Sequence, residues 1–115
     1  MPAGTYNLVI EKGATFERTI TWKDDAGNPV DLTGYTARMQ IRETVTADPP
    51  LVSLAVGSGI TLGGAAGTIQ IVIDATTTAG ITASQGVYDL ELEDGSGKVT
   101  RLLAGSVTFL EEVTR

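Results

Sequence analysis

The carboxylates of this chain are the side chains whose types and spacing could do chemistry. One loop, DDAGNPVD, gathers four oxygen-bearing side chains: Asp24, Asp25, Asn28 and Asp31. Carboxylate and amide oxygens are the hard ligands that calcium prefers. The loop lacks the evenly spaced ligands and the terminal Glu of an EF-hand, so we interpret it as a polar turn, with calcium binding as the alternative.

Two pairs of carboxylates have the residue types that glycoside hydrolysis uses: Asp89 with Glu91, and Glu111 with Glu112. One carboxyl of such a pair must stay protonated near neutral pH, which requires a pocket that raises its pKa. Asp89, Glu91 and Glu93 alternate with apolar residues, which is typical of a solvated strand face. Because the sequence indicates no such pocket, we expect no enzyme activity.

The segment GSGITLGGAAG, residues 57–67, is rich in glycine, as phosphate-binding loops are. It is not followed by a Lys-Ser/Thr pair, and no helix signal stands behind it to supply a dipole. The glycines are better explained by tight turns, or by the close approach of a neighbouring chain.

The composition excludes several kinds of site. The 115-residue chain contains no histidine and no cysteine. Ser-His and Cys-His catalysis, thiolate or histidine metal ligation and disulfide bonds are therefore all excluded. We predict no catalytic, cofactor-binding or metal-binding residues, and no cofactor.

The net charge is −6, with a sequence pI of about 4.4, and no stretch concentrates Lys or Arg. This argues against nucleic acid as a partner. No run is apolar and long enough to cross a bilayer, and the N-terminal residues do not resemble a secretory signal. We expect a protein that is made in the cytoplasm, has no membrane partner and is a folded monomer when isolated.

Short β-strands must position these side chains, because apolar residues fall on every second position between turn signals. Within ATTTAGITAS, we expect either a single helical turn or a crossover loop. The expected strands are residues 5–11, 15–23, 35–43, 51–56, two within 57–74, 87–94 and 98–110. In the last strand, Gly105 predicts a β-bulge.

Each strand is expected to have one face in the core. In 35–43, this face carries Tyr35, Ala37, Met39 and Ile41, whereas Thr36, Arg38, Gln40 and Arg42 face outward. The same rule places Tyr6, Leu8 and Ile10 inward, and also Phe16, Ile20 and Trp22, with Arg18 interrupting that row. The expected core anchors are Trp22, Tyr35, Tyr88 and Phe109.

About seven strands at this spacing predict an all-β fold, an antiparallel immunoglobulin-like β-sandwich that forms one domain over 1–115. A small closed barrel is the alternative. The N-terminal strand either completes its own sheet or reaches a neighbour's. We expect its own sheet, because Leu8 and Ile10 supply a face that can be buried.

Four motifs occur in a characteristic order: a strand opening with GATF, a D-x-x-G-x-P turn, DLTGYTARMQIR, and a penultimate strand beginning G-x-Y-D-L. From about Gly13 to Phe109, this order resembles the immunoglobulin-like domain of phage baseplate upper proteins and related small tail and virion proteins. The resemblance implies a non-enzymatic structural protein of the virion, in the tail, baseplate or neck. It also implies other virion subunits as partners and several symmetric copies in the particle.

The sequence is also compatible with other functions. Family baseplate proteins usually continue into a receptor-binding or oligomerising segment, and this chain ends at Arg115, which favours a free-standing assembly module. A capsid decoration or cement protein is the first alternative. A carbohydrate-binding module is the second, with Tyr6 as its candidate aromatic residue. Arg38, Gln40 and Arg42 are either solvated, which we favour, or meet an acidic neighbour in the particle.

Overall fold

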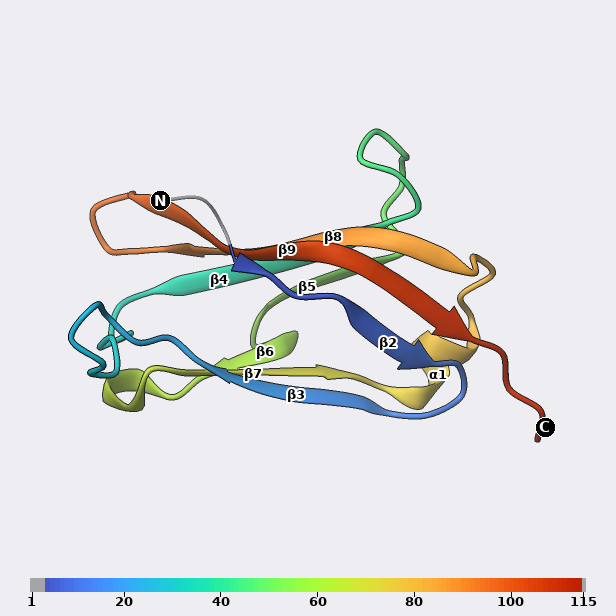
Figure 1. Cartoon of the computed structure of the whole chain (residues 1–115), viewed down its shortest axis with the longest axis horizontal. Coiled ribbons are helices and arrows are strands. Elements are labelled where there is room, and N and C mark those ends of the chain that lie inside the picture. Colours follow the sequence, from blue (N-terminus) through green and yellow to red (C-terminus); the bar gives the residue numbers. More distant parts are fainter. Residues whose placement is uncertain (1–3, 115) are drawn as a thin grey trace.

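The computed structural model describes residues 4–114 and shows an all-β, immunoglobulin-like sandwich (Figure 1). The predicted domain limits, 1 and 115, lie outside the described residues. The strands are β1 (Gly4–Thr5), β2 (Leu8–Glu11), β3 (Phe16–Thr21), β4 (Thr36–Arg42), β5 (Val52–Val56), β6 (Gly59–Leu62), β7 (Thr68–Ile73), β8 (Gln85–Glu93) and β9 (Val99–Leu110). A 3₁₀ turn (Gly64–Ala66) and the short helix α1 (Ala75–Ala79) complete the described elements.

The strands form two layers that are joined at one corner (Figure 1). One layer contains β9, β8, β4 and β5, with β1 and β2 both running parallel to β9. The other contains β6, β7 and β3, and the short parallel contact between β5 and β6 forms the corner. The strand order ends at β3 on one side and at β1 on the other, so the described strands do not close into the alternative barrel.

The predicted inward faces meet between the two layers. Ala37, Met39 and Ile41 of β4 are at most 5% exposed, as are Leu8 and Ile10 of β2. Leu90 and Leu92 of β8 join them. The alternation in these strands is therefore confirmed, and the N-terminal strand belongs to its own sheet, as expected.

The aromatic residues agree less well with prediction. Tyr88 and Phe109 are buried core residues, as predicted. Trp22 and Tyr35 pack edge-to-face at the border of the core, with ring centroids 6.1 Å apart, but both are only half-buried. Tyr6 was expected to face inward, yet its side chain is 43% exposed. It lies between β1 and β2, where the strand is interrupted and the alternation does not hold.

The β-bulge in β9 is not at Gly105, so that prediction is wrong. The register shifts between Leu90 and Glu91 of β8, which pair with Leu103 and Arg101 and leave Leu102 as the extra residue. Gly105 instead permits a close approach, since a Cβ built on it would lie 2.5 Å from the carbonyl oxygen of Tyr6. The missing side chain lets the N-terminal segment, which runs parallel to β9, lie close against it.

Three hydrogen bonds hold the N-terminal segment at this close approach. The Tyr6 amide donates to the Ala104 carbonyl at 3.0 Å, and the Tyr88 hydroxyl donates to the Tyr6 carbonyl. The Ser106 amide donates to Asn7 Oδ1 at 3.1 Å. The break between β1 and β2 is therefore a defined contact in which each of these polar groups has a partner.

The predicted helical turn is present as α1. Asp74 caps it by accepting a hydrogen bond from the Thr77 amide at 2.7 Å, and the bonds from Thr77 hold the pKa of Asp74 below its ordinary value. Thr78, fully buried, donates to the Ala14 carbonyl at 2.8 Å and accepts from the Gly13 amide at 3.1 Å. The helix thus ties the loop before β3 to the end of β7. In residues 4–114 there is no helix long and apolar enough to span a membrane.

The phenol of Tyr88 should make the stability of the fold depend on alkaline pH. Burial, with a smaller effect from the charge of Tyr6, raises the pKa of Tyr88 from 10.0 to about 12. The folded state then holds this proton more tightly than the unfolded chain does. The stabilisation is complete below about pH 10 and is lost as the pH rises towards 12.

We expect the Tm to fall across that window, and Tyr88→Phe to flatten the fall. Thermal unfolding followed by circular dichroism from pH 8 to 12 measures the difference. Equal alkaline slopes for the parent and Tyr88→Phe would contradict the assignment.

Candidate interaction face

The outer face of the β9–β8–β4 layer carries an ordered array of charges. Because opposite residues in paired strands share a face, the registers place Arg101, Glu91 and Arg38 in one row across the three strands. The neighbouring row contains Ala104, Asp89 and Gln40. Positive and negative side chains therefore alternate across the sheet.

These charges neutralise one another. Arg38 lies 2.9 Å from Glu91 and 3.1 Å from Glu93. On the other side of β8, Arg101 lies 3.4 Å from Asp89 and 3.9 Å from Glu91. The ion pairs are partly exposed, so each adds little to stability. Their main consequence is a face with little net charge on an acidic protein.

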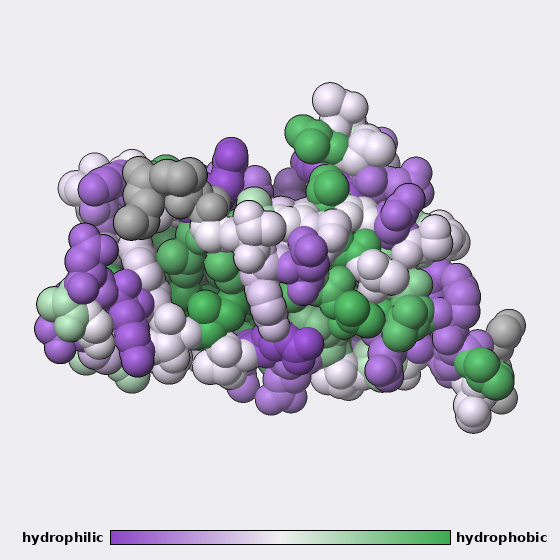
Figure 2. All heavy atoms as spheres, in the orientation of Figure 1, coloured by the Kyte–Doolittle hydropathy of each residue, from purple (hydrophilic) through white to green (hydrophobic). Residues whose placement is uncertain are grey.

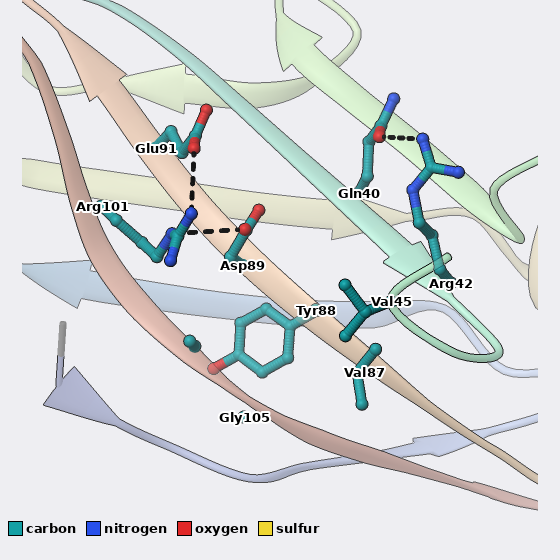
Figure 3. A pocket seen from close by; sticks show the side chains of 10 residues that line it. Gln40, Arg42, Val45, Val87, Tyr88, Asp89, Glu91, Arg101 and Gly105 are labelled. Carbon is teal, nitrogen blue, oxygen red and sulfur yellow. Dashed lines mark hydrogen bonds and ion pairs between the residues drawn. The ribbon is translucent and has the colours of Figure 1, made fainter. Parts of the chain in front are cut away.

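A shallow hollow of about 470 Å³ lies in this face (Figure 3). Ala104 and Gly105 of β9 contribute the smallest side chains of its lining. Figure 3 shows Arg101 directed at both Glu91 and Asp89. On the opposite side, Arg42 donates to Gln40 Oε1 at 2.8 Å, and Val45, 80% exposed, stands at the rim.

The outward side chains of β4 were expected to be solvated, and Arg38 and Gln40 are exposed as expected, whereas Arg42 is half-buried. Arg38 pairs with two carboxylates of β8. Arg42 is half-buried, donates to the Ala47 carbonyl and lies 3.7 Å from Asp48. These contacts lie within the chain, so the positive charges need no partner from another protein.

The carboxylate pairs from the sequence do not form a catalytic arrangement. Asp89 and Glu91 are ion-paired to arginine. Glu111 lies 2.7 Å from Nζ of Lys12, a lysine whose side chain is only 7% exposed. The carboxylate of Glu112 occupies the space that a Cβ on Gly13 would need. The buried Lys12 was missed from the sequence, because nothing in its neighbours indicated burial.

The acidic turn uses its side chains to hold its own backbone. Asp24 accepts from the amides of Ala26 and Asn28, each at 3.0 Å. Asp31 accepts from the amide and the hydroxyl of Thr33, and these bonds lower its pKa. Among residues 4–114, no group of acidic side chains could hold a metal ion. The polar-turn interpretation therefore accounts for the motif.

The glycine-rich segment forms turns, as expected. Gly67 follows the 3₁₀ turn with a φ of 69°, and a Cβ there would lie 2.9 Å from the Trp22 carbonyl oxygen. Close approach within the chain therefore explains this glycine.

Several large apolar side chains are exposed on the described surface. On the face that Figure 2 shows, green apolar atoms gather in patches near the middle, with white and purple atoms between them. The large side chains that are clearly exposed are Tyr6, Val9, Val45, Val56, Val99, Leu110 and Val113. Tyr6 is the one aromatic residue of this set, so a sugar ring would find a single tyrosine rather than a stacking surface of several rings.

Comparisons with known proteins give a distant likeness. No protein-family model matches the chain, and no curated protein matches it. Similar solved structures include extracellular domains of the voltage-gated sodium channel β4 subunit, described as parallel homodimers with a role in cell–cell adhesion. The likeness has a TM-score of 0.48 at 11% identity, over 98% of this chain and 97% of that one.

A second similar structure comes from photo-crosslinking work on multimeric cell-adhesive interactions of sodium channel β subunits. Its TM-score is 0.46 at 10% identity, over 96% of this chain and 93% of that one. Neither likeness is close enough to carry an inference about function.

Proposed function

We propose that this chain is a non-enzymatic structural protein of a bacteriophage virion, an adaptor module of the tail, baseplate or neck that works through protein–protein contacts. The particle assignment is supported by the order of the GATF, D-x-x-G-x-P, DLTGYTARMQIR and G-x-Y-D-L motifs. Its place of action is then the virion, its partners are other virion subunits, and it is present in several symmetric copies.

The observation that carries the contact role is the paired outer face of β9, β8 and β4. Three arginines (Arg38, Arg42 and Arg101) and four carboxylates (Asp48, Asp89, Glu91 and Glu93) pair there, which leaves this face a charge of only −1. The remaining five basic and ten acidic residues carry the other −5 of the net charge of −6. A neighbouring subunit that docks on this face avoids the electrostatic repulsion that the acidic remainder of the surface imposes.

Filling the hollow in this face should block incorporation into the particle while leaving the fold intact. Ala104→Trp places a large ring on the hollow's lining, and its Tm should stay within a few degrees of the parent. The matched control is Ala65→Trp, in the exposed 3₁₀ turn. We expect virions assembled with Ala104→Trp to contain less than a tenth of the normal amount of this protein by quantitative mass spectrometry, and those with Ala65→Trp to contain the normal amount.

Two outcomes would count against the proposal. Equal incorporation of both variants would mean that the outer face is not the contact. Fully assembled, infectious particles that lack the protein would refute the proposal that it is a structural protein of the virion. Fractionating heads from tails decides between the tail adaptor and the alternative, a capsid decoration or cement protein, since recovery with heads alone supports the latter.

A further inference from the structure

Strand β3 has one side without a described partner. It pairs with β7 along its whole length, from Phe16 opposite Ile73 to Thr21 opposite Thr68, and it ends the strand order. Figure 1 shows it at the margin of its layer. Within residues 4–114, no strand pairs with the other side of β3.

The register shows which backbone groups point to this open side. Ladder hydrogen bonds in an antiparallel pair alternate along each strand. The Trp22 amide donates to the Gly67 carbonyl at 2.8 Å, so the even-numbered residues of β3 direct their backbone groups to β7. The amides and carbonyls of Glu17, Thr19 and Thr21 therefore face outward along the edge.

Arg18 lies in the middle of this edge at a position that alternation assigns to the core. Its partner Ile71 is 2% exposed, yet Arg18 itself is exposed. The guanidinium lies 5.2 Å from the centre of the Phe16 ring, and Nη1 is 3.4 Å from the Glu17 carbonyl oxygen. No carboxylate among the described residues forms an ion pair with it, in contrast to Arg38, Arg42 and Arg101.

This charge discourages a second copy of the chain from pairing with the same edge. In an antiparallel pair of two β3 strands that continues the sheet, opposite residues share a face. Arg18 would then meet Phe16, Arg18 or Ile20 of the other copy, and none of these is acidic. An inward-pointing charge on an edge strand is a known device against such pairing.

We propose that the open edge of β3 is a strand-addition site for an extended segment of another protein that carries Asp or Glu opposite Arg18. The outward backbone groups of Glu17, Thr19 and Thr21 supply the hydrogen bonds, and Arg18 supplies the selectivity. The inference rests on the proposed function, and it names the edge and the chemistry of one partner.

The test titrates the ¹⁵N-labelled chain with a capped eight-residue peptide of alternating Thr and Val that has one central Glu. A matched peptide has Lys in place of Glu. We expect chemical-shift changes and slowed amide exchange at Glu17, Thr19 and Thr21. We also expect the Glu peptide to bind about fivefold more tightly than the Lys peptide, as a cross-strand charge pair allows. Arg18→Glu should reverse this preference.

Two variants and one modified peptide distinguish backbone hydrogen bonding along β3 from nonspecific binding. Thr19→Pro removes an outward amide but no ladder bond to β7, and it should abolish binding of both peptides. A Glu peptide N-methylated on alternate residues should also fail to bind, and it leaves the protein unchanged. Glu17→Gln, which keeps the backbone, should bind the Glu peptide at least as well as the parent.

Peptides that bind with equal affinity, or shift changes that map outside β3, would overturn this inference. So would a peptide that does not bind at all. Those results leave the proposed function untouched, because incorporation of the Ala104→Trp variant tests it separately. The two tests can also give different answers. If the peptides bind β3 with the expected charge selectivity but virions do not contain the protein, the strand-addition site is supported and the proposed role in the particle is refuted.

Discussion

Removing residues 1–11 should leave the domain largely unfolded, or lower its Tm by more than 20 °C. The deletion takes away β2, whose Leu8 and Ile10 are 4% and 0% exposed, and uncovers the side of β9 that β2 pairs with. Losing a buried Leu or Ile side chain typically costs about 2 to 5 kcal/mol. Two such losses approach the roughly 5 to 15 kcal/mol of a whole domain.

Single substitutions in β2 provide graded controls. Ile10→Ala should cost about 2 to 5 kcal/mol in the free energy of unfolding, because its side chain is fully buried. Val9→Ser, on the adjacent half-exposed residue, should cost less than about 1 kcal/mol. Urea denaturation followed by tryptophan fluorescence measures both, since Trp22 is the sole tryptophan.

A stable shortened chain would mean that β2 does not belong to its own sheet. If the shortened chain unfolds at the parent's Tm but no longer enters the particle, β2 contributes to a neighbour's sheet and not to its own. That result would contradict the parallel pairing of Leu8–Glu11 with Val107–Leu110.

The sequence predicts the strands well because alternation is a local property. The apolar residues of β4 and β8 repeat every second position, and the structure buries those residues. The turns are also encoded locally. Asp94 accepts from the amides of Ser96 and Lys98, each at 2.9 Å, within a Gly-containing loop that already predicts a hairpin.

The errors arise where residues distant in sequence meet. Within the sequence of β9 alone, Gly105 predicts a β-bulge. Its role depends instead on the carbonyl group of Tyr6, a residue near the other end of the chain that lies against it. The β-bulge is at Leu102, where no glycine in the sequence indicates it. Trp22 has the sequence features of a core anchor, yet the open margin beside β3 leaves it half-buried.

The candidate face could be predicted only in part. Alternation correctly places Arg38 and Glu91 on outward faces of their strands. It does not say that β4 and β8 are neighbours or that the two residues are directly opposite, and the face depends on both facts. Pairing between strands that are about fifty residues apart is a property of topology, which a single sequence does not reveal.

The substitution Gly105→Val on β9 should be strongly destabilising. Its Cβ would lie 2.5 Å from the Tyr6 carbonyl oxygen and 3.0 Å from Asn7 Oδ1, so the N-terminal segment must move. The movement also breaks the hydrogen bond from the Tyr88 hydroxyl. Overpacking and a lost bond together cost roughly 2 to 4 kcal/mol. Gly95→Ala, where a Cβ meets nothing within 4 Å, is the matched control and should be neutral.

A double-mutant cycle shows whether that cost comes from the close approach of the N-terminal segment to Gly105. Deleting residues 1–7 removes Tyr6 and Asn7, the two residues that a Cβ on Gly105 would strike, but keeps Leu8 and Ile10 in the core. In this shortened chain, Gly105→Val should cost less than about 1 kcal/mol, because its steric conflict is gone. The coupling energy should then be about 1 kcal/mol or more, as expected for residues in direct contact. A full cost in both backgrounds would place the damage within β9, and Gly105 would have a role unrelated to the N-terminal segment.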